Sequence, residues 1–314
     1  MREHKVTNDV HWLENSNQGI IAFSKNGREE EDHFLQIRVS EFFMSFKADQ
    51  AILYQEKNRS DLHIIPELGE PYVLQGEFSL YGAFNTENGP AVINVPEKKY
   101  FLVNLASGEL NDLGFLYSPS FCNYPLLFQK KKSTIDIYNI DHDVRTTIDI
   151  KPFFRDLDDR IDEIIGLHQE EWLLIRLKSG LLLKWNIQSV ETKVIRQLIG
   201  RCVLFNEQLY SVTNNILEKI NLESGQIVQP KNLDGLAKKY NFHPTGRHKV
   251  YDDYIFIMSA GKPGMVTIFE RSSFSFKDLI SFSGQIPVGT EHLHWKNDKL
   301  YVLDGGNTLH IYEQ

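Results

Sequence analysis

The chain has 314 residues, of which 41 % are hydrophobic and 12 % aromatic, so it can bury most of its apolar surface on folding. Its formal charge of −8 argues against wholesale binding to nucleic acid or to an anionic membrane. Residues 1–12 are polar and charged, and no uninterrupted run of 18 apolar residues occurs. We therefore expect a cytoplasmic protein without a membrane span or signal peptide.

A strand-like run that closes on an aromatic or aliphatic residue recurs seven times along the chain. The closing residues are Ile65, Val103, Tyr138, Trp185, Ile220, Phe269 and Tyr312. Four of them are followed by Asn and then by Leu or Ile. The mean spacing is about 41 residues, close to the ~40 to 45 residues of a four-stranded propeller blade.

Each closing run lies in the same local context. Upstream of it is a tight hairpin, such as residues 42–46 with 51–54, or residues 202–205 with 208–212, in which apolar and polar residues alternate. Such alternation between turn residues indicates antiparallel strands. Downstream, Gly108 and Gly225 lie where a second hairpin must turn with positive φ. Each unit is therefore predicted to have four strands, A to D.

These residues resemble a known superfamily, the WD40-like and quinoprotein-like β-propellers. The resemblance is carried by the run from Lys184 to Ile187 and by the turns Ser107-Gly108 and Ser224-Gly225, and it covers about residues 42 to 314. No Trp-Asp pair and no Gly-His dipeptide occurs. The resemblance implies an all-β propeller and no particular chemistry. A two-sheet sandwich, or two smaller β domains, is the alternative that the length allows.

We predict a single domain, residues 1–314, with seven four-stranded blades. The chain ends in a C-type strand, so residues 1–41 are expected to supply the outermost strand of the last blade and close the ring. Two segments could do so, His33–Val39 and Gly19–Ser24.

Strand alternation places the A-to-B and C-to-D turns on one rim, and the B-to-C and D-to-A connections on the other. The second rim carries the insertions, residues 151–162 and 230–246, the latter with a possible helical turn at residues 233–240. Long connections on a rigid scaffold often bind partners, although simple tolerance of loop length is the alternative. The candidate partner-binding residues of the first insertion are Phe153, Phe154, Asp156, Asp158 and Asp159.

Basic residues gather in the B-to-C connections of the same rim. They are Lys57, Arg59, Lys98, Lys99, Lys130, Lys131, Lys132, Lys178 and Lys262. Such a ring could attract an acidic patch on another protein, while lysines that merely solvate the turns are the competing interpretation. Nucleic acid is disfavoured, because the neighbouring aspartates interrupt any continuous basic stripe.

Catalytic motifs are weak, and no cofactor is expected. His292 and His294 lie two apart without an evident third metal ligand. Cys122 and Cys202 are predicted to be buried free thiols. The leading hypothesis is a protein–protein interaction module, either a scaffold or a neutralising binder. A metal-dependent hydrolase or lyase with its site in the central funnel is an alternative, as is binding of a polyanion or phospholigand at the basic rim. Partner identity and oligomeric state stay open.

Overall fold

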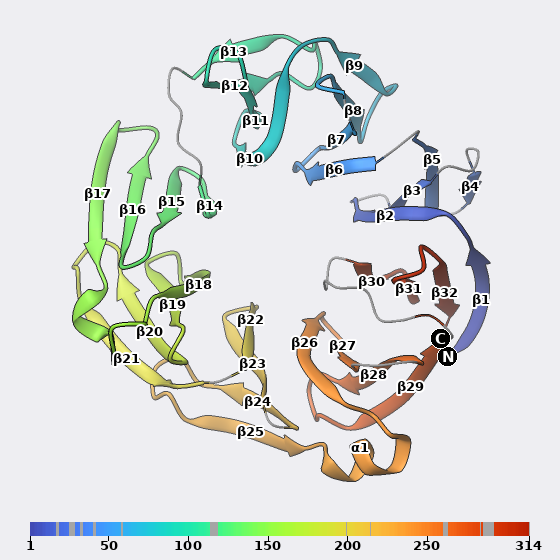
Figure 1. The fold of residues 1–314 in the computed structure, drawn as a ribbon, viewed down its shortest axis with the longest axis vertical. Helices are drawn as coiled ribbons and strands as arrows, with labels where there is room; N and C mark the ends of the chain where they lie inside the picture. The colour runs from blue at the N-terminus through green and yellow to red at the C-terminus, as the bar shows by residue number, and fades with distance from the viewer. Residues whose placement is uncertain are drawn as a thin grey trace.

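Eight four-stranded sheets form a ring in the computed structural model, with their innermost strands facing a central axis (Figure 1). The structure describes residues 1–16, 19–24, 29–31, 34–39, 42–57, 59–113, 119–198, 200–213, 215–259, 263–282, 284 and 292–313. The chain therefore has the all-β propeller architecture that the repeat predicts, with one blade more than the seven expected.

The strands of each sheet are named A to D from the axis outward. The A strands are β2 (Val10–Asn15), β6 (Phe42–Lys47), β10 (Phe78–Thr86), β14 (Phe121–Asn123), β18 (Ile161–His168), β22 (Arg201–Phe205), β26 (Pro244–Val250) and β30 (Leu293–Lys296). The B strands are β3 (Ile20–Ser24), β7 (Ala51–Glu56), β11 (Gly89–Asn94), β15 (Leu126–Lys130), β19 (Trp172–Leu177), β23 (Gln208–Thr213), β27 (Tyr254–Ser259) and β31 (Lys299–Leu303).

The outer half of each blade holds the C and D strands. The C strands are β5 (Phe34–Arg38), β8 (Leu62–Pro66), β12 (Lys99–Val103), β16 (Thr134–Asn139), β20 (Leu181–Asn186), β24 (Ile216–Ile220), β28 (Gly264–Glu270) and β32 (Leu309–Glu313). The D strands are β4 (Glu29–Glu31), β9 (Tyr72–Leu74), β13 (Leu110–Asp112), β17 (Val144–Asp149), β21 (Thr192–Gln197), β25 (Ile227–Asn232), β29 (Phe276–Phe282) and β1 (Arg2–Thr7).

The core lies between neighbouring blades, where the B and C strands are most deeply buried. Every residue of β20 is buried, and Trp185 on it packs in one cluster with Phe128 of the preceding blade. Such a continuous apolar run is typical of a strand covered on both faces. The D strands are more polar, as in β17, where only Ile148 is buried. The burial gradient explains why the closing runs are the clearest signal in the sequence.

All seven closing residues lie on C strands, as the spacing predicts. The predicted turn geometry is also confirmed. Asn206 and Glu207 both have positive φ in the hairpin between β22 and β23, and Gly108 and Gly225 have φ of 74° and 68°. Two successive positive φ values match the right-handed twist of the strands that they join.

The count of seven blades is wrong, because an eighth lies in residues 10–39. In this first blade the chain visits the outer strand β4 before the C strand β5, so β3 and β5 pair in parallel. The Gln36 amide donates to Ser24 Oγ across that pair at 2.6 Å. A unit with this order has no C-to-D hairpin of the repeated kind, and the closing-run pattern therefore misses it.

The ring is closed by an N-terminal strand, as predicted, but not by either expected segment. Gly19–Ser24 and the described part of His33–Val39 lie in the first blade. Instead β1 pairs antiparallel with β32 in the last sheet, which brings the two termini together in Figure 1. His310 links the two strands further: its Nδ1 lies 3.0 Å from Glu3 Oε1, and its Nε2 lies 3.1 Å from the buried Asp304.

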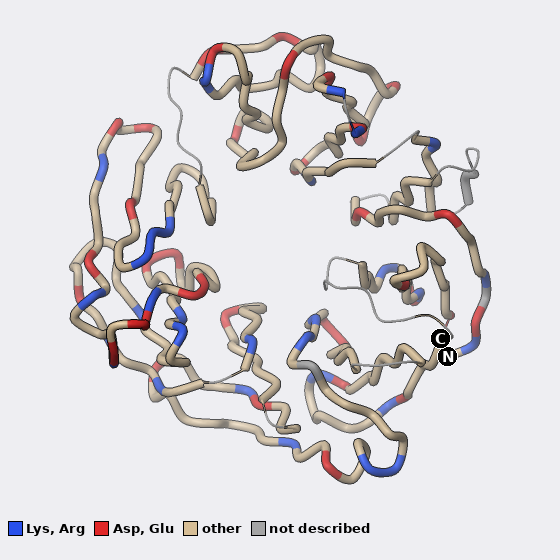
Figure 2. The backbone as a smooth tube through the Cα atoms, viewed as in Figure 1, with Lys and Arg blue, Asp and Glu red and all other residues tan. Residues whose placement is uncertain are grey.

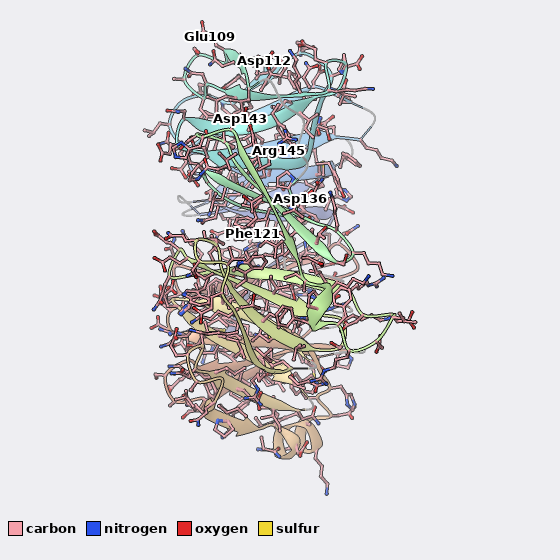
Figure 3. The ribbon with its side chains drawn as sticks, turned by 90° about the vertical axis from the view of Figure 1, so that its left-hand side faces the viewer. Glu109, Asp112, Phe121, Asp136, Asp143 and Arg145 are labelled. Atoms are coloured by element: carbon pink, nitrogen blue, oxygen red, sulfur yellow. The ribbon has the colours of Figure 1, made fainter. Side chains whose placement is uncertain are left out.

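The two rims differ as the strand order requires. We call the rim with the A-to-B and C-to-D turns the short-turn rim, and the other the insertion rim. In the side view of Figure 3, Glu109 and Asp143 of two C-to-D turns lie to the left, while Asp136 near the start of β16 lies to the right. The insertion rim carries the short 3-10 helix η1 (Lys151–Phe153) and the helix α1 (Asp234–Tyr240). The helical turn predicted at residues 233–240 is confirmed.

The boundaries of both insertions are narrower than expected. Asp162 is already in β18, and the strands β25 and β26 occupy both ends of the expected 230–246 insertion, leaving residues 233–243 as the connection. Cys122 and Cys202 are free, and burial raises the pKa of each thiol to about 12. Cys202 is buried and Cys122 half-buried. Among the described residues, no helix has the length and apolar character needed to cross a membrane.

Candidate partner-binding surface

The insertion between β17 and β18 is held against the core at its base. Phe153 and Phe154 pack on the apolar cluster shared by the fourth and fifth blades, and the Ile150 N–H donates to Ser133 O at 2.9 Å. Both phenylalanines are half-buried. They therefore anchor the loop to the core and offer little surface to a partner.

Asp159 fastens the other end of the insertion. Only 2 % of it is exposed, and its carboxylate accepts N–H bonds from Arg155 at 3.2 Å, Arg160 at 3.0 Å and Ser179 at 2.9 Å. Burial by itself would raise the pKa of this carboxyl group, but the hydrogen bonds, led by that from Ser179, hold the pKa below its usual value. Asp159 thus ties the insertion to the turn between β19 and β20.

Two basic turns flank the insertion. The Ile161 N–H donates to Lys132 O at 3.0 Å, and the Lys178 N–H donates to Arg160 O at 2.8 Å. Lys130 donates through Nζ to Asp162 O at 2.6 Å. We call residues 130–133, 150–162 and 178–180 the insertion patch. It brings together nine of the predicted site residues, from two blades and three connections: Lys130, Lys131, Lys132, Phe153, Phe154, Asp156, Asp158, Asp159 and Lys178.

Charges of both signs lie together on this patch, and Figure 2 shows blue and red segments side by side there. Lys131 pairs with Asp136 at 2.5 Å, and the hydrogen bond from Lys131 lowers the pKa of that aspartate. Lys132, Lys178, Asp156 and Asp158 are exposed. The patch is therefore charged but not uniformly basic.

Leu157 is the residue that sequence reasoning missed. It lies at the tip of the insertion between Asp156 and Asp158, and 96 % of it is exposed. Single exposed apolar residues are common on protein surfaces, and what distinguishes Leu157 is that it stands on a loop whose two ends are fixed to the core. In the sequence, Leu157 is a single leucine within an aspartate-rich insertion, so a search for charged residues does not select it.

The remaining predicted residues are spread around the insertion rim. Arg59 pairs with Glu56 at 3.5 Å beside Lys57 on the second blade. Lys99 pairs with Asp112 at 2.7 Å on the third blade, next to the exposed Lys98. Lys262 lies outside the described residues. The described side chains of the second and third blades do not join the insertion patch into one basic ring.

The described side chains also bear on the alternative hypothesis of a metal-dependent hydrolase or lyase. Among them, no group of three or more His, Cys, Asp or Glu residues is placed to hold a metal ion. A cluster of charged side chains lies on the short-turn rim between the fifth and sixth blades. There the buried Lys184 pairs with Glu223 at 2.5 Å, and His168 Nδ1 lies 2.6 Å from Glu207 Oε2. These contacts join two blades.

The comparisons with known proteins agree with the geometry. No family model and no curated protein matches the chain. Among solved structures, BamB from Moraxella catarrhalis aligns with a TM-score of 0.61 at 13 % identity over 100 % of this chain and 99 % of that one. Apo AztD from Citrobacter koseri aligns at 0.52 with 15 % identity over 87 % and 86 %. The computationally designed Ika8 protein aligns at 0.52 with 10 % identity over 100 % and 98 %. At these identities the likeness establishes the propeller fold alone.

Proposed function

We propose that the chain is a protein–protein interaction module that binds its partner through the insertion patch. The observation that carries this proposal is Leu157, a large apolar side chain exposed at the tip of a loop whose two ends are fastened. A preordered apolar anchor loses little conformational entropy on binding, which favours its use at the centre of an interface.

The charges around Leu157 supply the rest of a typical interface. Lys132, Lys178, Asp156 and Asp158 are all exposed on the insertion patch, and they can form a polar rim that selects a partner by complementary charge. Because Lys132 and Lys178 are positively charged, the expected counterpart on the partner is an acidic patch. A scaffold and a neutralising binder use such a surface in the same way.

The test compares two exposed leucines on opposite rims. Tagged wild-type protein, Leu157→Ser and the control Leu68→Ser are expressed in the source organism, and co-purifying proteins are quantified by mass spectrometry. Leu68 is 89 % exposed in a C-to-D turn of the short-turn rim. We expect a partner whose recovery falls about tenfold or more with Leu157→Ser and stays unchanged with Leu68→Ser, since a buried apolar anchor contributes roughly 1.5 to 3 kcal/mol.

The same partner, once purified, is titrated against each variant. Lys132→Glu together with Lys178→Glu should weaken binding further if the partner presents carboxylates. Recovery of no specific protein, or of proteins that Leu157→Ser and Leu68→Ser affect equally, would contradict the proposal.

A further inference from the structure

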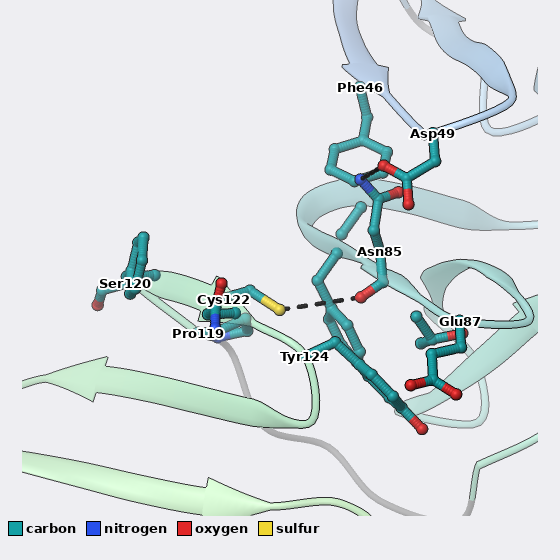
Figure 4. A pocket seen from close by; sticks show the side chains of 13 residues that line it. Phe46, Asp49, Asn85, Glu87, Pro119, Ser120, Cys122 and Tyr124 are labelled. Carbon is teal, nitrogen blue, oxygen red and sulfur yellow. Dashed lines mark hydrogen bonds between the residues drawn. The ribbon is translucent and has the colours of Figure 1, made fainter. Parts of the chain in front are cut away.

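The short-turn rim contains a recess that the proposed function does not use. It has a volume of about 550 Å³ and lies where the second, third and fourth blades meet. Its lining comes from the inner strands and A-to-B turns of those blades, including Phe46, Asp49, Asn85, Glu87 and Tyr124. Figure 4 shows Glu87 and the Tyr124 ring on one side, with Asn85 beside Asp49.

A second hollow of about 230 Å³ continues the recess toward the C-to-D turn of the third blade. The two share Asp49, Asn85, Thr86 and Glu87 in their lining. The second hollow also reaches Asn104 and Leu105. Together they form an elongated depression, a shape that suits an extended chain segment more than a single small molecule.

The short-turn rim as a whole is rich in acidic residues, and two of them, Asp49 and Glu87, line the recess. In the described turns between A and B strands and between C and D strands, fifteen residues are acidic and one, Arg271, is Lys or Arg. The acidic residues are Asp49, Glu67, Glu70, Glu87, Glu109, Asp141, Asp143, Glu170, Glu171, Glu191, Glu207, Glu223, Asp252, Asp253 and Asp298. All but Glu67 are exposed. Charge of one sign on one face attracts and orients a partner of the opposite sign.

Asn85 forms part of the wall of the recess. Its Nδ2 donates to Asp49 Oδ1 at 3.2 Å, which directs the amide. Its Oδ1 is buried and has no hydrogen-bond partner among the described residues. The bond to Asp49 fixes the Asn85 amide in the wall of the recess, next to the Asp49 carboxylate.

The walls of the recess suit the stems of long cationic side chains. Phe46 and Phe121 are half-buried and line the cavity, and the Tyr124 hydroxyl is directed away by its bond to Asp141 Oδ1 at 2.7 Å. Lysine and arginine pack their methylene groups on such rings while the charged ends reach carboxylates.

From the elongated cavity, the Asp49 and Glu87 carboxylates in its lining and its aromatic walls, we propose that the recess binds a lysine- or arginine-rich segment of a partner protein. This surface lies on the rim opposite the insertion patch, so it adds to the proposed function and can be tested independently of it.

The test uses the full chain and a rhodamine-labelled, end-capped hexapeptide of alternating Lys and Arg, with a Glu hexapeptide for comparison, followed by fluorescence anisotropy. Glu87→Gln removes a charge from the recess, and Asn123→Trp obstructs it without changing charge, since Asn123 is an exposed lining residue at the end of β14. The matched control is Glu170→Gln, in the A-to-B turn of the fifth blade on the same rim.

We expect the basic peptide to bind, with its affinity falling as salt rises, and the Glu peptide not to bind. Glu87→Gln and Asn123→Trp should each weaken binding about fivefold or more, while Glu170→Gln changes it less than about twofold. Equal losses for Glu87→Gln and Glu170→Gln, with none for Asn123→Trp, would show diffuse attraction to the rim and overturn the site. Binding of spermine or Ca²⁺ without binding of the peptide would overturn the choice of partner.

Discussion

The two rims of this propeller are built from the same strands but differ in length of connection and in charge. The insertion rim has long connections of mixed charge, with Leu157 exposed above a loop fastened by Asp159. The short-turn rim has two- to six-residue turns, and among their described residues the acidic ones outnumber the basic ones fifteen to one. The two proposed surfaces therefore lie on opposite faces of one ring, so a partner on one would leave the other accessible.

The insertion rim should depend most on Asp159. Asp159→Ala removes the acceptor of three N–H bonds at a buried position, and we expect a loss of about 3 kcal/mol in the free energy of unfolding. Urea denaturation measures it. The exposed neighbour Asp158→Ala is the control, with an expected change below about 0.5 kcal/mol. A similar small change for both variants would show that the insertion is not held by Asp159.

The same residue carries a pH dependence. Its pKa in the folded protein lies below the usual value, so its stabilising contribution is present above about pH 4 and is lost as pH falls through the folded pKa. The stability difference between wild type and Asp159→Asn should therefore be largest near neutral pH and shrink in acid. A difference that grew in acid would contradict the assignment.

Substitution of a carboxylate on the short-turn rim should change the free energy of unfolding little, and Glu223 is the exception. Glu223→Gln leaves the buried Lys184, only 1 % of which is exposed, without its charged partner. Because an unpaired buried ammonium is costly, we expect destabilisation of about 2 kcal/mol. Glu109→Gln, in the corresponding turn of the third blade, should change stability by less than about 0.5 kcal/mol. Thermal unfolding of the two variants distinguishes a structural carboxylate from one that only contributes to the field.

Glycine substitutions sharpen the comparison at the backbone level. At Gly225 of the short-turn rim φ is +68°, and an added Cβ would come within 2.4 Å of Ile195 O. Gly225→Ala should cost about 1 to 2 kcal/mol. Gly235 in α1 of the insertion rim has nothing within 4 Å of such a Cβ, so Gly235→Ala should stabilise the protein by about 0.5 to 1 kcal/mol. Gly225→Ala is expected to lower the melting temperature and Gly235→Ala to raise it. Changes of the same sign in both variants would contradict this difference between the two rims.

The blade repeat, the strand order within a blade and the assignment of connections to rims could all be predicted from local pattern. Trp185 and its six counterparts are buried on C strands, where apolar runs are longest, and Gly108 and Gly225 occupy turns that demand positive φ. The first blade was not predicted because β3 and β5 pair in parallel, with β4 between them in the sequence but not in the sheet. Parallel pairing leaves no local hairpin signature.

The candidate surfaces were predictable in part. Because strand direction alternates within a blade, the sequence alone placed Lys132, Lys178 and the aspartates of the insertion on one rim. Whether they meet depended on contacts between blades, such as the Lys178 N–H to Arg160 O bond. The acidic character of the other rim was present in the sequence, but its fifteen described residues are spread over eleven short turns, with at most two in any turn, and form no long run.

By itself, therefore, the sequence determined the kind of strand and turn at each position, because hydrophobic period and backbone preference are properties of neighbouring residues. Only the tertiary structure decided the number of blades, the choice of β1 as the closing strand, the exposure of Leu157 and the recess beside Asn85. Each of these depends on how segments far apart in the chain pack against one another, and the free energy of that packing is not encoded in any local window.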